Sequence, residues 1–185
     1  MRKVMMVLVA AACTVAVGCT LPPRLMNALH PGTDEMKITS QFEADKAREM
    51  SQEKGNNTIK GSALMRQDGG CIVTCAGDTV DLIPATAYAN ERMQITCGSI
   101  LRGFLDARSM RQTIKFSLDP PEYMVFRRKS TCDALGFFKF EEVPDGEYFL
   151  TTAITWSVGS STQGGFLMLR VEVKGGKTIE VVLAP

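Results

Sequence analysis

Histidine is almost absent from this chain of 185 residues, which contains only His30. Many zinc sites use imidazole as a ligand, and a serine nucleophile needs a base such as histidine to take its proton. His30 lies in a proline-containing segment that no predicted element holds beside a serine. The sequence therefore argues against zinc and against covalent catalysis, and we expect no catalytic residue, no metal and no cofactor.

The chain also lacks a strong net charge. It contains 21 lysine and arginine residues against 20 aspartate and glutamate residues, which gives a formal net charge of +1. A protein with so balanced a composition has no large positive field directed toward phosphate groups. We therefore expect no nucleic-acid partner.

No apolar run reaches the roughly 20 residues that a membrane-spanning helix requires. The N-terminal hydrophobic stretch covers residues 4–17, follows Arg2 and Lys3, and stops before Cys19. A basic start, a short apolar run and small residues at its end are typical of a signal peptide. We therefore predict that residues 1–18 are removed on export.

The small residues just before Cys19 resemble the lipobox of bacterial lipoproteins, in which the cysteine sulfur receives a diacylglycerol. The resemblance implies a mature chain that begins at Cys19 and is anchored to membrane lipid. It also implies a location in the cell envelope, at the outer membrane facing the periplasm if the cell is Gram-negative. Ordinary secretion, which would leave Cys19 as a free thiol, is the alternative.

Residues 19–55 are predicted to form a tether that ends in a short helix. Residues 20–39 contain three prolines and no sustained hydrophobic period. Ser40 and Glu43 have the spacing of a capping box, and helix-forming residues then continue to Lys54. We interpret this helix as a spacer, with a docking surface for a partner as the alternative.

Cysteine is scarce beyond the tether, but its number is even. The four residues are Cys71, Cys75, Cys97 and Cys132. An even set in an exported chain favours disulfides. The CxxxC spacing of Cys71 and Cys75 differs from the CxxC of redox motifs, and structural zinc is the weaker alternative. The spacing alone leaves three pairings open.

Residues 56–185 show a hydrophobic period of two, which is typical of strands with one buried face. The runs that show it are 59–65, 80–82, 114–118, 138–140, 148–156, 167–173 and 179–183. Gly175 and Gly176 fit a two-residue hairpin between the last two strands. Because no helices alternate with these strands, a parallel sheet is not expected. We predict an all-β fold in which about seven antiparallel strands form a β-sandwich.

The alternation lapses near residues 86–112, the longest insertion, which we expect to be partly helical. Long insertions on a rigid sandwich often carry binding surfaces. The candidate binding residues are therefore Tyr88, Glu91, Arg92, Arg102 and Phe104. A flap over one sheet edge is the alternative. Tyr88 and Trp156 could stack on a sugar, although Trp156 shares its face with Leu150 and Ile154, which favours the core.

The segment CDALGFFKFEEVPDGEY, residues 132–148, resembles the hallmark of the carboxypeptidase regulatory-like domain, a transthyretin-like β-sandwich. The resemblance spans residues 56–185, apart from the insertion. It implies a disulfide between Cys75 and Cys132, which leaves Cys71 to pair with Cys97. Enzymes with the transthyretin-like fold hydrolyse 5-hydroxyisourate with histidines and a C-terminal tyrosine-rich motif, and neither is found at the matching place in this sequence.

These features predict a non-catalytic envelope lipoprotein that serves as a scaffold or adaptor for a protein partner. A glycan- or peptidoglycan-binding module is the second hypothesis, and a hydrolase is the third. The predicted organisation is a signal peptide at 1–18, an anchored tether with a helix at 19–55, and a sandwich at 56–185.

Overall fold

The computed structural model describes residues 35–110, 115–117 and 119–185. The predicted signal peptide, Cys19 and the first part of the tether lie outside these residues. Within the described part of the chain, no helix combines the length and the apolar character that crossing a membrane requires.

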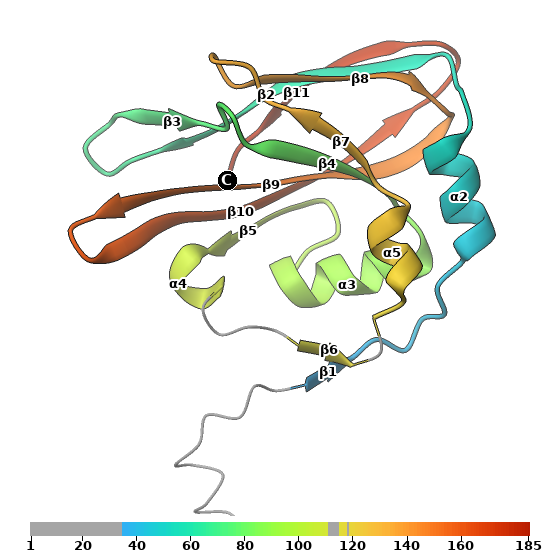
Figure 1. Ribbon diagram of the computed structural model, residues 1–185, viewed down its shortest axis with the longest axis horizontal. Coiled ribbons are helices and arrows are strands. Elements are labelled where there is room, and N and C mark those ends of the chain that lie inside the picture. The colour runs from blue at the N-terminus through green and yellow to red at the C-terminus, as the bar shows by residue number, and fades with distance from the viewer. Residues whose placement is uncertain (1–34, 111–114, 118) are drawn as a thin grey trace, which may run out of the picture. The chain divides into compact units, whose positions relative to one another are not determined.

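Two sheets stack as a β-sandwich (Figure 1). The first sheet is antiparallel throughout, in the order β5 (Arg102–Asp106), β10 (Ser161–Val173), β9 (Gly146–Val158), β4 (Thr79–Pro84) and β7 (Arg128–Thr131). The second sheet comprises β11 (Thr178–Leu183), β2 (Asn57–Arg66), β3 (Ile72–Thr74) and β8 (Phe137–Val143), with every other strand paired to β2. The predicted β-sandwich is confirmed, with nine strands in place of about seven.

The period-two pattern of the sequence determines which side chains enter the core. In β2, Ile59 and Ala63 are fully buried while Lys60 is exposed. Tyr148 and Leu150 of β9 belong to the same buried cluster and come from the other sheet. Alternation along each strand therefore directs one face of each sheet into a shared core.

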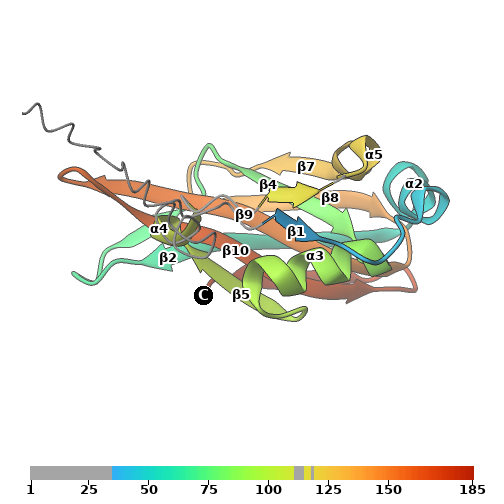
Figure 2. The ribbon, with the colours of Figure 1, turned by 90° about the horizontal axis from the view of Figure 1, so that it is seen from below.

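A second apolar cluster lies on the outer face of the first sheet. There Phe149 and Met168 are fully buried against Tyr88 and Met93 of α3 (Ala87–Cys97). Figures 1 and 2 show α3 on the outer side of this sheet, and α2 (Ala44–Gln52) and α5 (Pro121–Val125) also lie beside the sandwich. The insertion is partly helical, as expected: α3 covers the outer face of the sheet, and β5 covers the edge of β10.

The prediction of purely antiparallel pairing is wrong for the last strand. β11 pairs with β2 in parallel, so Gly175 and Gly176 connect two different sheets and do not form a hairpin. The physical reason is that β10 already has β9 and β5 as neighbours on its two edges. Asn57 stabilises this connection between β10 and β11, because its Oδ1 accepts a hydrogen bond from the Lys177 amide at 2.9 Å.

The 114–118 run does not contribute a strand to the sandwich. Its described part, β6 (Lys115–Ser117), pairs in parallel with β1 (Glu35–Lys37), and these two strands form a separate small sheet. Residues 114 and 118 lie outside the described residues. Short strands that pair only with the N-terminal segment are not distinguishable from core strands by their alternation alone.

The short helix predicted after Ser40 is present as α2, but its start differs. It begins at Ala44 without a side-chain cap, so Ser40 and Glu43 do not form a capping box. The carboxylate of Glu43 instead accepts a hydrogen bond from the amide of Ala87, at the start of α3, at 3.1 Å. A contact distant in sequence has replaced the local cap.

The cysteines follow the prediction in one pair and contradict it in the other. Cys75 and Cys132 form a disulfide, and both are buried in the sandwich core. Cys71 is exposed and Cys97 is partly buried, and both are free thiols. Burial raises the pKa of the Cys97 thiol to about 11. The predicted Cys71–Cys97 disulfide is therefore wrong, because Cys97, at the end of α3, lies against Gly103 of β5, whereas Cys71 is in the β2–β3 turn.

Candidate functional site

Tyr88 and Arg92, two of the predicted binding residues, are structural. Tyr88 is only 4% exposed, and its hydroxyl donates a hydrogen bond to the carboxylate of Asp119. Burial, followed by this hydrogen bond, raises the pKa of Tyr88 to about 12. Arg92 pairs with the same carboxylate and stacks on the ring of Phe116 at 3.9 Å. Tyr88 therefore offers no stacking surface to a sugar, contrary to the prediction, because α3 turns it toward the sheet.

Glu91, on α3, holds the N-terminal segment. Its carboxylate accepts hydrogen bonds from the amides of Thr39 at 2.8 Å and Ser40 at 2.7 Å, and from the Thr39 hydroxyl. Hydrogen bonds from Ser40 and Thr39 lower the pKa of Glu91 to about 2. Glu91 is thus an attachment point within the chain rather than a ligand contact.

We expect Glu91→Gln to release this segment. A lowered pKa means that the stabilisation is complete above the ordinary value of 4.5 and is lost as the pH falls toward 2. At neutral pH the variant should show faster amide exchange at Thr39 and Ser40, measured by hydrogen–deuterium exchange, with the sandwich strands unchanged. Glu53→Gln, at an exposed glutamate after α2, is the control. Equal exchange in both variants would contradict the assignment.

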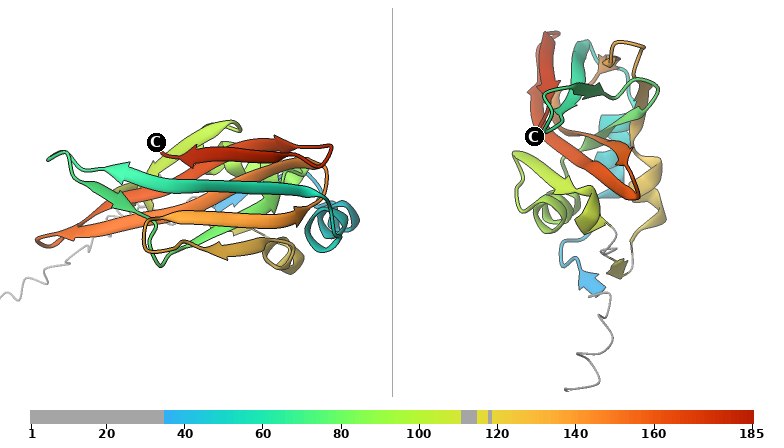
Figure 3. Two further views of the ribbon diagram at one scale, coloured as in Figure 1. Left: turned by 90° about the horizontal axis from the view of Figure 1, so that it is seen from above. Right: turned by 90° about the vertical axis from the view of Figure 1, so that its left-hand side faces the viewer.

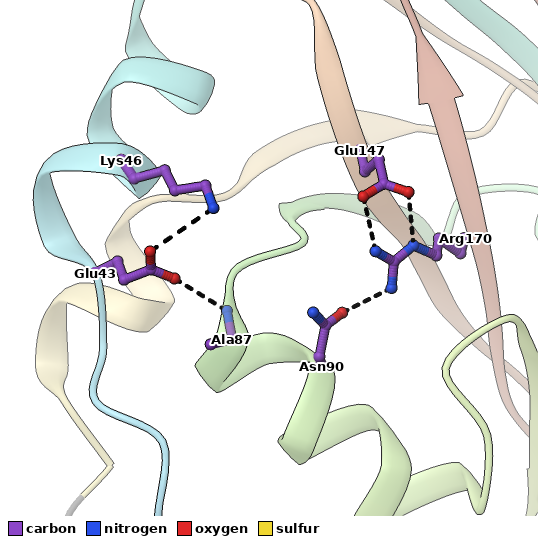
Figure 4. A network of polar contacts seen from close by, with 6 residues as sticks. All are labelled: Glu43, Lys46, Ala87, Asn90, Glu147 and Arg170. Carbon is purple, nitrogen blue, oxygen red and sulfur yellow. Dashed lines mark hydrogen bonds and ion pairs between the residues drawn. The ribbon is translucent and has the colours of Figure 1, made fainter.

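A polar network fixes α3 against the sheet (Figure 4). The guanidinium of Arg170 donates to both oxygens of Glu147, at 3.2 and 2.8 Å, and its third nitrogen donates to Asn90 of α3 at 2.8 Å. The Arg170 hydrogen bonds lower the pKa of Glu147. Because Arg170 and Glu147 come from β10 and β9, the helix is attached to two central strands, and the insertion is part of the scaffold.

The two remaining predicted residues come from β5. The Nη1 of Arg102 donates to the carbonyl oxygen of Ala184 at 2.9 Å, which joins the edge of the first sheet to the end of β11. Phe104 is 37% exposed and lines a cleft. Phe104 is thus the only one of the five predicted binding residues that lies in the candidate site described below.

A cleft of about 350 Å³ opens at one end of the sandwich. The β2–β3 and β9–β10 turns project at this end (Figures 1 and 3). The cleft is lined by Met65, Arg66, Gln67, Asp68, Phe104, Asp106, Arg108, Trp156, Gln163, Gly164 and Pro185. Its volume falls within the range of clefts that bind small organic ligands.

Trp156 and Gln163 occupy opposing positions on β9 and β10. The indole N–H of Trp156 donates to the side-chain oxygen of Gln163 at 3.1 Å, which fixes the orientation of the ring. Trp156 is partly buried and packs against the sandwich core. The prediction that it packs with the core residues is confirmed, and in addition its ring lines the cleft.

Two glycines of β10 make room for the aromatic rings. A Cβ on Gly164 would lie 2.9 Å from the Trp156 ring and 2.1 Å from the carbonyl oxygen of Ile154. A Cβ on Gly165 would lie 2.6 Å from the ring of Phe104. Because any larger residue would displace these groups, the glycine pair is required for the position of both rings.

Charged side chains of both signs line the cleft. Arg66 and Asp68 come from β2 and the turn after it, whereas Asp106 and Arg108 come from the end of β5 and from α4 (Ala107–Met110). All four are exposed. None of the ion pairs between described residues includes any of them. The cleft therefore combines two aromatic rings with exposed hydrogen-bond donors and acceptors.

Most residues of the cleft were not predicted as binding residues. Arg66, Asp106 and Gln163 lie far apart in sequence and come together only because the end of β2, the end of β5 and the start of β10 meet at one end of the sandwich. The available sequence signal was the Gln163, Gly164 and Gly165 triplet, since paired glycines inside a strand indicate a close approach by another group. Among the described residues, no group of three or more potential ligands could hold a metal ion.

The chain matches no protein-family model, and no significant match is found among curated proteins. The carboxypeptidase regulatory-like assignment therefore stays a prediction. The crystal structure of chlorocatechol 1,2-dioxygenase from Pseudomonas putida is similar with a TM-score of 0.28 and 11% identity, over 81% of this chain and 64% of that chain. A similarity this distant supports no conclusion.

A second crystal structure is much more similar. It is that of a proposed carbohydrate-binding protein from Pseudomonas aeruginosa, with a TM-score of 0.66 and 26% identity. The match covers 79% of this chain and 99% of that chain. This chain thus shares its β-rich fold with a proposed carbohydrate-binding protein over nearly the whole length of that protein.

Proposed function

We propose that this chain is a non-catalytic glycan-binding module and that the cleft at the end of the sandwich is its binding site. The observation that carries the proposal is the combination, in one cleft, of the Trp156 and Phe104 rings with four charged side chains that form no ion pair with another described residue. The similarity to a proposed carbohydrate-binding protein supports the same function. This choice replaces the adaptor function as the leading hypothesis.

The chemistry of a sugar ring suits this arrangement. One face of a pyranose consists mainly of C–H groups, which pack on an aromatic ring, whereas the hydroxyl groups point outward in the ring plane. Carboxylates accept hydrogen bonds from hydroxyls, and guanidinium groups donate to them in a fixed fork. Trp156 would support the ring face, while Asp106 and Arg108 would bind hydroxyl groups at its edge.

We also propose that the protein acts in the cell envelope and has no catalytic activity. A lipid on Cys19 would hold the sandwich at a membrane surface, close to the glycans of the envelope. The fold by itself does not determine function, so the proposal depends on the cleft residues.

The test uses the single tryptophan of the chain, Trp156, as an internal reporter. Screening the protein on an array of bacterial and plant glycans should identify ligands, and titration with each should change the tryptophan emission because the ring lines the cleft. Ligands that bind without altering the emission would place the site elsewhere. Shortening of a bound glycan during the titration would contradict the non-catalytic assignment.

The adaptor function remains a second candidate because of one surface. Val182 and Phe137, each 51% exposed, flank Ser62 in one row across the outer face of the second sheet. Exposed apolar residues grouped on one face are typical of protein-binding surfaces. Crosslinking in the native envelope tests it: a partner captured by the wild type and lost on Phe137→Ser would support an adaptor, and no reproducible partner would contradict it.

A further inference from the structure

We infer that the cleft binds an oligosaccharide of at least two rings, through two adjacent subsites, and not a single monosaccharide. The inference rests on the proposed glycan-binding function and specifies its ligand. It is carried by the positions of the two aromatic rings relative to β10.

The two aromatic rings approach β10 from the strands on either side of it. Trp156 reaches β10 at Gly164, and Phe104 reaches it from the opposite neighbouring strand at Gly165. Trp156 pairs with Gln163, and Phe104 pairs with Leu167. Gln163 and Leu167 are four residues apart in β10, so they point to the same face of the sheet. The two rings therefore lie on one face of the first sheet, on the two strands that flank β10, and both line the cleft.

Each aromatic ring offers a stacking surface for one sugar unit. A phenyl or indole ring matches the face of one pyranose in size, so two separate rings provide stacking surfaces for two sugar units. Glycine at both positions of β10 keeps backbone and rings in contact and adds no side chain between them. The aromatic surface is therefore continued across the strand instead of ending at one ring.

Each aromatic ring has a hydrogen-bonding side chain beside it. Gln163 opposes Trp156 and uses its side-chain oxygen to accept the indole N–H, so its amide hydrogens remain for a ligand. Asp106 opposes Gly165 and is two residues after Phe104 on β5, and one of its oxygens accepts a hydrogen bond from the amide of Arg108 at 2.7 Å. Its second oxygen accepts no hydrogen bond from another described side chain or amide, and we assign it to the ligand. Each subsite thus combines one aromatic ring with one hydrogen-bonding side chain.

Arg66 and Asp68 complete the cleft from the second sheet. They come from the far end of β2 and the turn after it, so they bind a ligand from the side opposite to the strands that carry the rings. A sugar chain lying along the rings would be contacted on its hydroxyl edges from both sheets. A monosaccharide would stack on only one of the two aromatic side chains and would leave the other, with its polar partner, without a ligand contact.

Calorimetry with a length series tests the inference. The probes are the mono-, di-, tri- and tetrasaccharides of chitin, cellulose and mannan, together with the same series for the strongest ligand on the array. We expect the disaccharide to bind about tenfold more tightly than the monosaccharide, as burial of the second aromatic face predicts. Longer oligosaccharides should add much less.

Phe104→Ala should remove this gain. Because Phe104 is an exposed residue of an edge strand, the variant should stay folded, and its affinity for the disaccharide should fall about tenfold, to the level of the monosaccharide. Phe104→Tyr should keep the gain. Leu135→Ala, at an exposed apolar residue outside the cleft, is the control and should have no effect.

The outcomes separate the two proposals. If the monosaccharide binds as tightly as the tetrasaccharide, or if Phe104→Ala weakens all lengths equally, the two-subsite inference is overturned while glycan binding stands. If no saccharide of any length binds and the array is blank, the proposed function fails and the inference fails with it.

Discussion

Replacing Trp156 by alanine is expected to lower the affinity of the protein for its saccharide roughly 60-fold. An aromatic side chain buries 150–250 Å² when fully covered, and stacking of one sugar face on the exposed part of Trp156 would bury roughly 100 Å² of apolar surface, counted over the indole and the sugar together. At about 25 cal/mol per Å², this area corresponds to about 2.5 kcal/mol of binding free energy. Isothermal titration calorimetry measures the change directly.

The core packing of Trp156 makes controls necessary. Because the indole also contacts the sandwich core, the alanine variant should lose stability, and circular dichroism must show that it is folded at the assay temperature. Trp156→Phe retains a stacking face and should lose much less affinity than Trp156→Ala. Equal affinities of the wild type and the alanine variant would exclude stacking on Trp156 as the basis of binding.

Loss of the Cys75–Cys132 disulfide is expected to have the largest effect on stability. The bond joins residues 57 positions apart, and its two ends follow β3 of the second sheet and β7 of the first sheet. A covalent link of this length restricts the unfolded chain and should contribute about 4 kcal/mol to the free energy of unfolding, by a chain-entropy estimate. Urea unfolding of Cys75→Ala/Cys132→Ala, compared with the wild type, measures it.

The free cysteines supply the control for this experiment. Cys71→Ala changes an exposed thiol outside the disulfide and should alter the free energy of unfolding by less than about 0.5 kcal/mol. A reductant added to the wild type should reproduce the destabilisation of the double variant. Stability that is indifferent both to reductant and to the double substitution would show that the sandwich core, without the covalent link, holds the two sheets together.

The positions of most strands along the chain, and the side chains that each strand buries, could be predicted from local sequence. Ile59, Ala63 and Phe138 alternate with exposed residues, and all three are buried as their spacing indicated. Alternation is a local property, because each side chain points opposite to the next whatever the strand pairs with. The same reasoning could not predict which strand is the neighbour of which, so the parallel pairing of β11 with β2 was missed.

The candidate site was predicted only in part, for a related reason. Phe104 is predicted as a binding residue because it belongs to a long insertion, whereas the sequence assigns Trp156 to the core in preference to a stacking surface. Tyr88 belongs to the same insertion, yet α3 buries it, since the direction of a helical side chain depends on the surface onto which the helix packs. Exposure is a tertiary property, and residue type does not indicate it.

The sequence by itself determined the β-sandwich, the residues of its inner faces and the presence of an N-terminal segment typical of export and lipidation. These features depend on hydrophobic period, on turn residues and on short contiguous motifs, all of which are local. Only the tertiary structure decided that Arg66, Asp68, Phe104, Asp106, Trp156 and Gln163 share one cleft. Their meeting depends on strand order and on the glycine pair of β10, which bring turns from both sheets to the same end of the sandwich.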